Sequence, residues 1–166
     1  MSIIAILFVS ISITNAQSFY VENDRLAWSK VYESDMNATD IVKSMLMSGN
    51  FRNIQLIDDS FISATLQEIN VDYERIGYKR MNLPLYISNN YFGPANIIVQ
   101  VKEGRYKVTV NNMILTEHYG TSLGGILDAV AIDDYGFSPT FVQYGAPIYN
   151  IVISECVTFD KVDEDW

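Results

Sequence analysis

The chain has 166 residues, of which 49% are hydrophobic and 13% aromatic, and its net charge is -9. The length suits one domain with its own core, and the composition excludes an intrinsically disordered chain. With 20 acidic and 11 basic residues, the chain repels phosphate backbones, so nucleic acid is not expected as a partner.

Residues 1–16 carry no charged side chain. Ile3–Ile13 is an apolar run interrupted by two serines, and Ala16 places a small residue before Gln17. This pattern predicts a signal peptide, although the first two residues lack the usual basic side chain. A buried strand and a membrane anchor are the alternatives, but the run is shorter than the roughly 20 residues that span a bilayer. We therefore expect an exported chain, periplasmic or extracellular, with a single domain over 17–166 and no stable membrane anchor after cleavage.

The first elements follow a polar lead-in over residues 17–24. Arg25–Glu33 predicts a strand, because its Trp, Val and Tyr residues favour extended backbone, but either face of it could be the buried one. A helix is then predicted between Asn37 as N-cap and Gly49 at its end. Its apolar residues recur at helical spacing on one side (Ala38, Ile41, Val42, Met45 and Leu46).

Phe51–Ile69 predicts a hairpin with the three-residue turn Asp58-Asp59-Ser60. This register places two apolar pairs on one face, Leu56 with Ile62 and Ile54 with Ala64. The adjacent aspartates lack the spacing of a calcium loop and are typical of a turn, so no metal site is expected there.

Asn70–Ala95 is a long connection in which tyrosines alternate with basic residues. We interpret these residues as aromatic packing with basic side chains lying over it, in preference to a nucleic-acid surface.

Asn96–Leu115 contains the most regular pattern in the chain, a hairpin whose tip is Glu103-Gly104. Opposite residues on antiparallel strands share a face, so the pairs Val101 with Tyr106, Val99 with Val108 and Ile97 with Val110 form one apolar face. The loop then has two or four residues, with Gly104 at positive φ. The other face carries a basic strip, Lys102, Arg105 and Lys107, which is either a candidate binding site or a solvated strand face.

Residues 117–147 are expected to form an accessory segment. Their glycine-rich part lacks the motifs of a phosphate loop or a dinucleotide fingerprint, so no cofactor is expected. The segment from Ile148 to Trp166 fits a helix or a strand, and we favour a helix preceded by Pro147.

Cys156 and His118 are the only cysteine and histidine in the chain. A cysteine nucleophile needs a base such as histidine, but no local motif connects this pair. We therefore predict no catalytic residues and interpret Cys156 as a small apolar residue.

In order, the elements predict an α+β fold with an antiparallel sheet of about five strands, β-α-β-β-β-β-α, and helices on one face. Three stretches also resemble an exported bacterial family of unknown function with a TATA-binding-protein-like (TBP-like) fold: Trp28-Ser29-Lys30-Val31-Tyr32, Gly104-Arg105-Tyr106-Lys107-Val108-Thr109 and Asp165-Trp166. The resemblance implies the same sheet-and-helix architecture and export, and no catalytic residues. A fold name carries no function by itself.

Two functions remain open on the sequence. The first is an exported, non-catalytic binding or assembly domain for a protein or glycan partner in the periplasm or cell envelope. The alternative is a small secreted hydrolase. The lack of the usual catalytic motifs favours the first, in which the chain is not an enzyme.

Overall fold

The computed structural model describes residues 18–117 and 124–161. The predicted signal peptide, His118 and the acidic C-terminus with Trp166 lie outside the described residues. No helix among the described residues has the length and apolar character needed to cross a membrane.

The prediction of an α+β fold built on an antiparallel sheet is confirmed. The main sheet has six strands in the order β1-β2-β7-β6-β4-β3. Their bounds are β1 Phe19–Glu22, β2 Arg25–Glu33, β3 Phe51–Asp58, β4 Phe61–Leu66, β6 Ala95–Lys102 and β7 Arg105–Asn111. Every pairing between neighbouring strands of this sheet is antiparallel.

The expected strand count of about five was low because the polar lead-in contains β1. Asn23 and Asp24 turn the chain back with φ values of 51° and 60°. Asn and Asp tolerate this left-handed conformation better than other non-glycine residues, so the two of them close a β1–β2 hairpin.

The β6–β7 hairpin has the predicted register. Lys102 pairs with Arg105, and Val101, Val99 and Ile97 face Tyr106, Val108 and Val110. Gly104 has a φ of 72°, as a tight loop requires. Four of these apolar side chains, Ile97, Val99, Val108 and Val110, are at most 1% exposed, so this face forms part of the core.

The register predicted for β3 and β4 was only partly right. Leu56 pairs with Ile62 as expected, but Asp58 pairs with Phe61, so Asp59 and Ser60 alone form the turn. Ile54 does not pair with Ala64, because register shifts occur between Arg52 and Gln55 and again between Leu56 and Asp58. Leu56 is 45% exposed, contrary to the expected burial. Alternation of side chains cannot reveal an extra residue in one strand, which is what a bulge adds.

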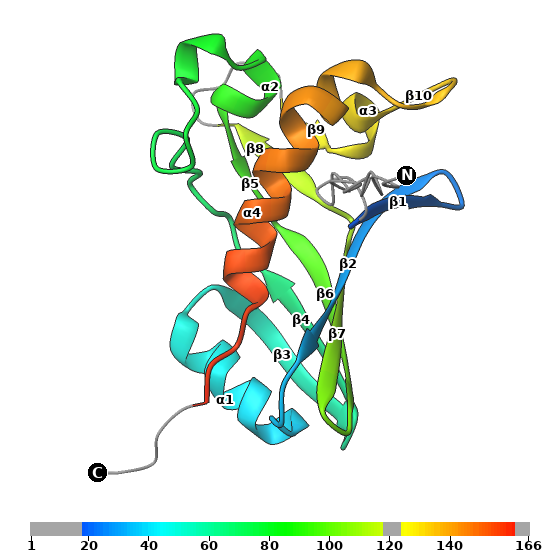
Figure 1. The fold of residues 1–166 in the computed structure, drawn as a ribbon, viewed down its shortest axis with the longest axis vertical. Coiled ribbons are helices and arrows are strands. Elements are labelled where there is room, and N and C mark those ends of the chain that lie inside the picture. Colours follow the sequence, from blue (N-terminus) through cyan, green and yellow to red (C-terminus); the bar gives the residue numbers. More distant parts are fainter. Residues whose placement is uncertain (1–17, 118–123, 162–166) are drawn as a thin grey trace, which may run out of the picture.

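Helices α1 (Ala38–Ser48) and α4 (Ala146–Val157) pack on one face of the main sheet, as predicted, and Figure 1 shows α4 lying along it. The predicted N-cap is confirmed, because the Asn37 side chain accepts a hydrogen bond from Asp40 N at 2.9 Å. Gly49 ends α1 in the left-handed conformation. The preference for a helix over a strand near the C-terminus is confirmed by α4.

Smaller elements complete the fold at the end of the main sheet away from α1 (Figure 1). The long connection contains a short 3-10 turn, the helical turn α2 and strand β5, and β5 belongs to a second sheet, β5-β8-β9. The remaining bounds are η1 Arg80–Asn82, α2 Leu85–Ser88, β5 Asn90–Phe92, β8 Ile114–Glu117, β9 Gly125–Ile126, α3 Asp128–Ala131, β10 Ile132–Asp133, β11 Gly136–Phe137 and η2 Phe141–Gly145.

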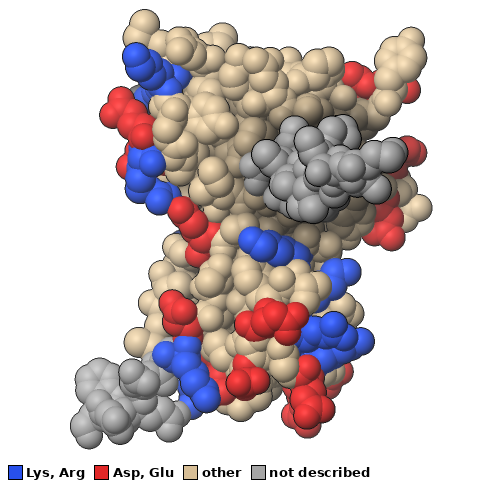
Figure 2. Space-filling model, viewed as in Figure 1, with Lys and Arg blue, Asp and Glu red and all other residues tan. Residues whose placement is uncertain are grey.

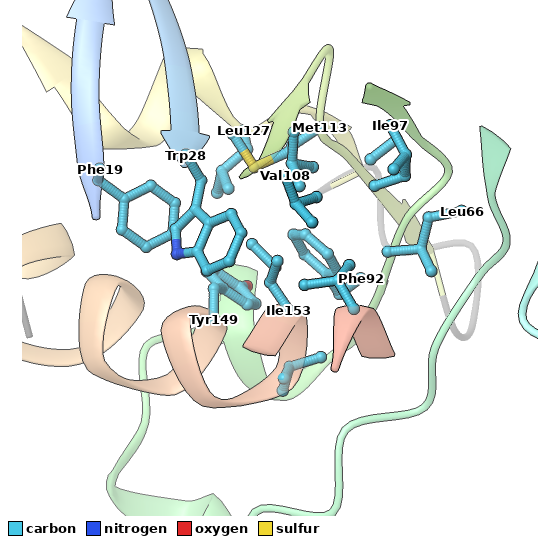
Figure 3. Packing of buried hydrophobic residues seen from close by; sticks show 14 of the residues in the cluster. Phe19, Trp28, Leu66, Phe92, Ile97, Val108, Met113, Leu127, Tyr149 and Ile153 are labelled. Atoms are coloured by element: carbon cyan, nitrogen blue, oxygen red, sulfur yellow. The ribbon is translucent and has the colours of Figure 1, made fainter. Parts of the chain in front are cut away.

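One apolar core connects the main sheet, α1, α4 and most of the smaller elements. Phe92 of β5 stacks on Tyr149 of α4 with ring centroids 5.0 Å apart, and the Trp28 indole donates a hydrogen bond to Asn150 Oδ1 at 3.0 Å. Figure 3 shows Trp28, Tyr149 and Ile153 packed beside Leu127. The described part of the proposed accessory segment, residues 124–147, therefore supplies side chains to the same core as the sheet.

Candidate functional site

The basic strip lies near the tip of the β6–β7 hairpin, on the sheet face opposite α1 and α4. Alternation places Lys102 and Gln100 on the same side of β6, and Arg105 and Lys107 on that side of β7. All four side chains are exposed, and no described helix packs over them. The structure thus brings together the three basic residues of the candidate binding site.

The strip encloses a shallow hollow of about 190 Å³. Its lining residues come from three neighbouring strands: Val31, Gln100, Lys102, Arg105 and Lys107. Val31 contributes an apolar surface that is 49% exposed. The sequence did not reveal Val31, because the pairing of β2 with β7 is a contact between distant segments that places it opposite Lys107.

The charges around the hollow are unbalanced. Lys102 and Arg105 stand directly opposite each other, so two cations face each other across the strands. Arg105 also has Glu33 opposite it on β2, whereas Lys107 faces the uncharged Val31 and Gln100. This arrangement can hold a carboxylate, sulfate or phosphate group, with the alkyl stems of the basic residues around it.

The helix-covered side of the molecule, unlike the basic strip, carries charges of both signs. Acidic and basic side chains are interspersed on the lower part of that side, and neither sign gathers into a large area (Figure 2). The Lys30 ammonium lies 5.1 Å from the centre of the Tyr32 ring and 3.5 Å from Ser154 Oγ. On this side, Lys30 is therefore engaged in contacts with the sheet and with α4.

Cys156 lies half-buried on α4, and burial together with the charge of Glu155 raises its thiol pKa to about 11. A thiol with this pKa is almost entirely protonated at neutral pH and is a poor nucleophile. His118, the histidine that a nucleophilic Cys156 would need as its base, lies outside the described residues.

The adjacent aspartates lie at the β3–β4 turn, with Asp58 as the last residue of β3 and Asp59 within the two-residue turn. Asp58 Oδ1 accepts hydrogen bonds from both Ser60 N and Ser60 Oγ at 2.8 Å. These bonds lower the pKa of the Asp58 carboxyl, so it is charged at neutral pH. Within residues 18–117 and 124–161, no three His, Cys, Asp or Glu side chains gather as a metal site would require.

The aromatic residues of the long connection pack as interpreted, since Tyr73 is buried and Tyr78 and Tyr86 pack against the core. Two of its basic residues make polar contacts instead. Arg75 forms a two-pronged ion pair with Glu155 of α4, at 2.8 and 2.5 Å. Arg80 Nε donates to the Ser88 carbonyl at 2.9 Å, and the Tyr73 hydroxyl donates to the Ile87 carbonyl. A second hollow of about 340 Å³ lies beside these residues, with Asp72 and Glu74 as well as Arg80 in its lining. Its mixed charges favour no single class of ligand.

A comparison with solved structures finds a similar chain. A TBP-like protein from Parabacteroides distasonis ATCC 8503, known from a crystal structure, is similar to this chain with a TM-score of 0.48 and 8% sequence identity. The match covers 85% of this chain and 98% of that one. No protein-family model matches the chain. No curated protein matches it either. Membership of the exported family remains a prediction.

Proposed function

We propose that the chain is a non-catalytic binding or assembly domain outside the cytoplasm, which holds an acidic protein or glycan on its basic strip. The observation that carries this proposal is the convergence of Lys102, Arg105 and Lys107 around a hollow on an exposed sheet face. The location outside the cytoplasm rests on the predicted signal peptide.

The energetics of the strip support an anionic partner. Like charges directly opposite each other on neighbouring strands destabilise a sheet by a few tenths of a kcal/mol. Lys102 and Arg105 form such a pair in the free protein. An anion placed between them replaces this repulsion with attraction, so part of its binding free energy comes from relief of a cost that the fold already bears.

The chain as a whole is acidic, with a net charge of -9. A polyanion is therefore repelled by most of the surface and attracted only near the strip, so charge itself selects the docking position. Because the strip is exposed to solvent, salt screens this attraction, and binding weakens as ionic strength rises.

The test is binding of two labelled probes, poly-glutamate and a sulfated polysaccharide, measured by fluorescence anisotropy at low and at physiological salt. The triple variant Lys102→Glu, Arg105→Glu, Lys107→Glu is expected to weaken binding by about tenfold or more. The matched control, Lys30→Glu, Lys79→Glu, Lys161→Glu, changes the net charge equally at exposed lysines elsewhere and is expected to retain most of the binding.

Two results would contradict the proposal. One is equal loss of binding in the triple variant and its control, which would show a general effect of net charge. The other is a wild-type protein that binds neither probe at low salt.

A further inference from the structure

Strand β3 forms one edge of the main sheet, and its outer side pairs with no described strand. It also exposes apolar side chains, with Leu56 45% and Ile57 61% accessible to solvent. The unpaired N–H and C=O groups of an edge strand are a template for another strand. Many proteins blunt such edges with charge, proline or very short strands, but β3 has eight residues and no proline.

The sequence of β3, Phe-Arg-Asn-Ile-Gln-Leu-Ile-Asp, complements itself when two copies run antiparallel. A register centred on Gln55 places Gln55 opposite its own counterpart and Ile54 opposite Leu56 of the second copy. It also places Arg52 opposite Asp58, and the two-fold axis repeats each of these pairs. One register therefore forms two apolar contacts and two pairs of opposite charge, with Asn53 opposite Ile57 between them.

The faces of the sheet agree with this register. Arg52 pairs with Thr65 and Asp58 with Phe61, and both partners belong to the face opposite the helices. Leu56 pairs with the fully buried Ile62, so it belongs to the helix-covered face. Ile54 packs against the same core. Residues that oppose each other across the axis thus point to the same side, as sheet pairing requires.

The irregularities of β3 lie on both sides of Gln55. One register shift falls between Arg52 and Gln55 and the other between Leu56 and Asp58. Bulges usually discourage pairing at a sheet edge, because they twist the strand away. In this register the bulged part of one copy meets the bulged part of the other, so the two deviations coincide.

We propose that β3 pairs with β3 of a second copy of this chain, in the antiparallel register centred on Gln55, to form one continuous sheet across a two-fold axis. The Ser60 backbone and hydroxyl fix the position of the Asp58 carboxylate through Oδ1. A carboxylate offers about four acceptor sites, so this leaves acceptor capacity for Arg52 of the second copy.

The dimer would place both basic strips on the same side of the joined sheet, because the axis is perpendicular to it. Between β6 and its counterpart lie five strand spacings, or about 24 Å at the usual separation of neighbouring strands. A partner with repeated acidic groups could then contact both strips and bind more tightly than a single strip allows. The pairing itself depends on a different surface and does not require the proposed function.

The first test is sedimentation equilibrium of the purified chain. An interface of one strand pair is small, so we expect a weak dimer with a dissociation constant between roughly 1 µM and 1 mM. Arg52→Asp and Asp58→Arg each place like charges opposite each other and are expected to weaken dimerisation by about tenfold or more. Mixing the two variants restores opposite charges at both positions, so the mixture is expected to regain the wild-type affinity.

This mixing result cannot come from misfolded variants. A wild-type chain that stays monomeric up to about 1 mM, or a mixture no tighter than either variant alone, would overturn the proposal. Neither result bears on the basic strip, whose binding is measured separately with the anionic probes.

The second test fixes the register. Gln55→Cys brings two sulfurs together at the axis, where paired residues have Cα atoms about 4.5 or 5.5 Å apart, within the range of a disulfide. The variant is expected to form a covalent dimer on mild oxidation. In the matched control, Ile57→Cys, the two cysteines lie about four residues apart along the joined strands and stay unlinked. Wild-type protein gives the background from Cys156, and equal cross-linking in both variants would exclude this register.

Discussion

The two faces of the β6–β7 hairpin are built from alternate residues of the same strands, yet they have different roles. On the covered face, Tyr106 is 2% exposed, and its hydroxyl donates to the Val157 carbonyl while accepting from Phe159 N. On the open face, the adjacent residues Arg105 and Lys107 are exposed and line a hollow. The side chains of the covered face are used in core packing, whereas those of the open face are available to contact a partner.

The two faces of the sheet are expected to differ most in the free energy of unfolding lost on truncation to alanine, and two residues of β2 show this. Trp28→Ala removes a fully buried indole that bonds to Asn150, and should lower the free energy of unfolding by about 4 kcal/mol. Val31→Ala, on the open face of the same strand, should change it by less than about 0.5 kcal/mol. Urea denaturation of both variants measures the contrast, and similar losses would show that the open face is also packed.

The buried tyrosines make the stability of the fold depend on pH in the alkaline range. Burial raises the pKa of Tyr73 to about 12, from an ordinary value of 10.0. Above pH 10 the unfolded chain therefore ionises this group while the folded chain does not. The stability that its neutral form supplies is present below pH 10 and is lost as the pH rises toward 12.

Tyr73→Phe isolates this contribution. The variant is expected to be less stable than wild type near neutral pH, because it loses the bond to Ile87, but its stability should fall less between pH 10 and 12, by about 2 kcal/mol. Denaturation curves at pH values on either side of this window provide the measurement. Tyr86→Phe makes a useful comparison, since burial raises its pKa to about 12 as well. An unchanged fall in the Tyr73 variant would mean that this hydroxyl is solvated.

A smaller effect is expected where the C-terminal segment joins the sheet. Tyr106→Phe keeps the ring contacts with Tyr32 and Phe159 but removes two hydrogen bonds, which should cost about 1–2 kcal/mol. Limited proteolysis should then cut near Phe159 sooner than in wild type. Lys107→Ala, the neighbouring open-face variant, should leave both the stability and the cleavage rate almost unchanged.

The sequence predicted the parts of this fold in which local pattern and tertiary structure agree. Alternation excluded a one-residue slip of the β6–β7 register, because such a slip would put Ile97, Val99 or Val108 into water. The cap at Asn37 followed from local chemistry. In each case the information lies within a few residues of the feature itself.

Other parts depend on contacts that no local pattern contains. The bulges of β3 add a residue without changing the composition of the strand, so the predicted pair of Ile54 with Ala64 was wrong. Leu127 and Phe141 are fully buried, and Phe141 packs against Phe19 near the other end of the chain, although the segments around them have little periodicity. For the candidate site, the sequence supplied the three cations, but Val31 required the pairing of β2 with β7.

The smallest effect on stability is the most informative about the open face. Lys102→Gln removes a cation that stands opposite Arg105, so it should raise the free energy of unfolding by a few tenths of a kcal/mol. The same change should weaken binding of the anionic probes, because the strip loses one of its three charges. Lys79→Gln removes an equal charge away from the strip and should change neither quantity measurably.

A residue that lowers the stability of the fold while improving binding is expected on a surface that contacts a partner. On a strand face that contacts only solvent, no binding would offset the lost stability. If Lys102→Gln instead destabilises the fold and leaves probe binding intact, the strip is only part of the sheet's solvated surface.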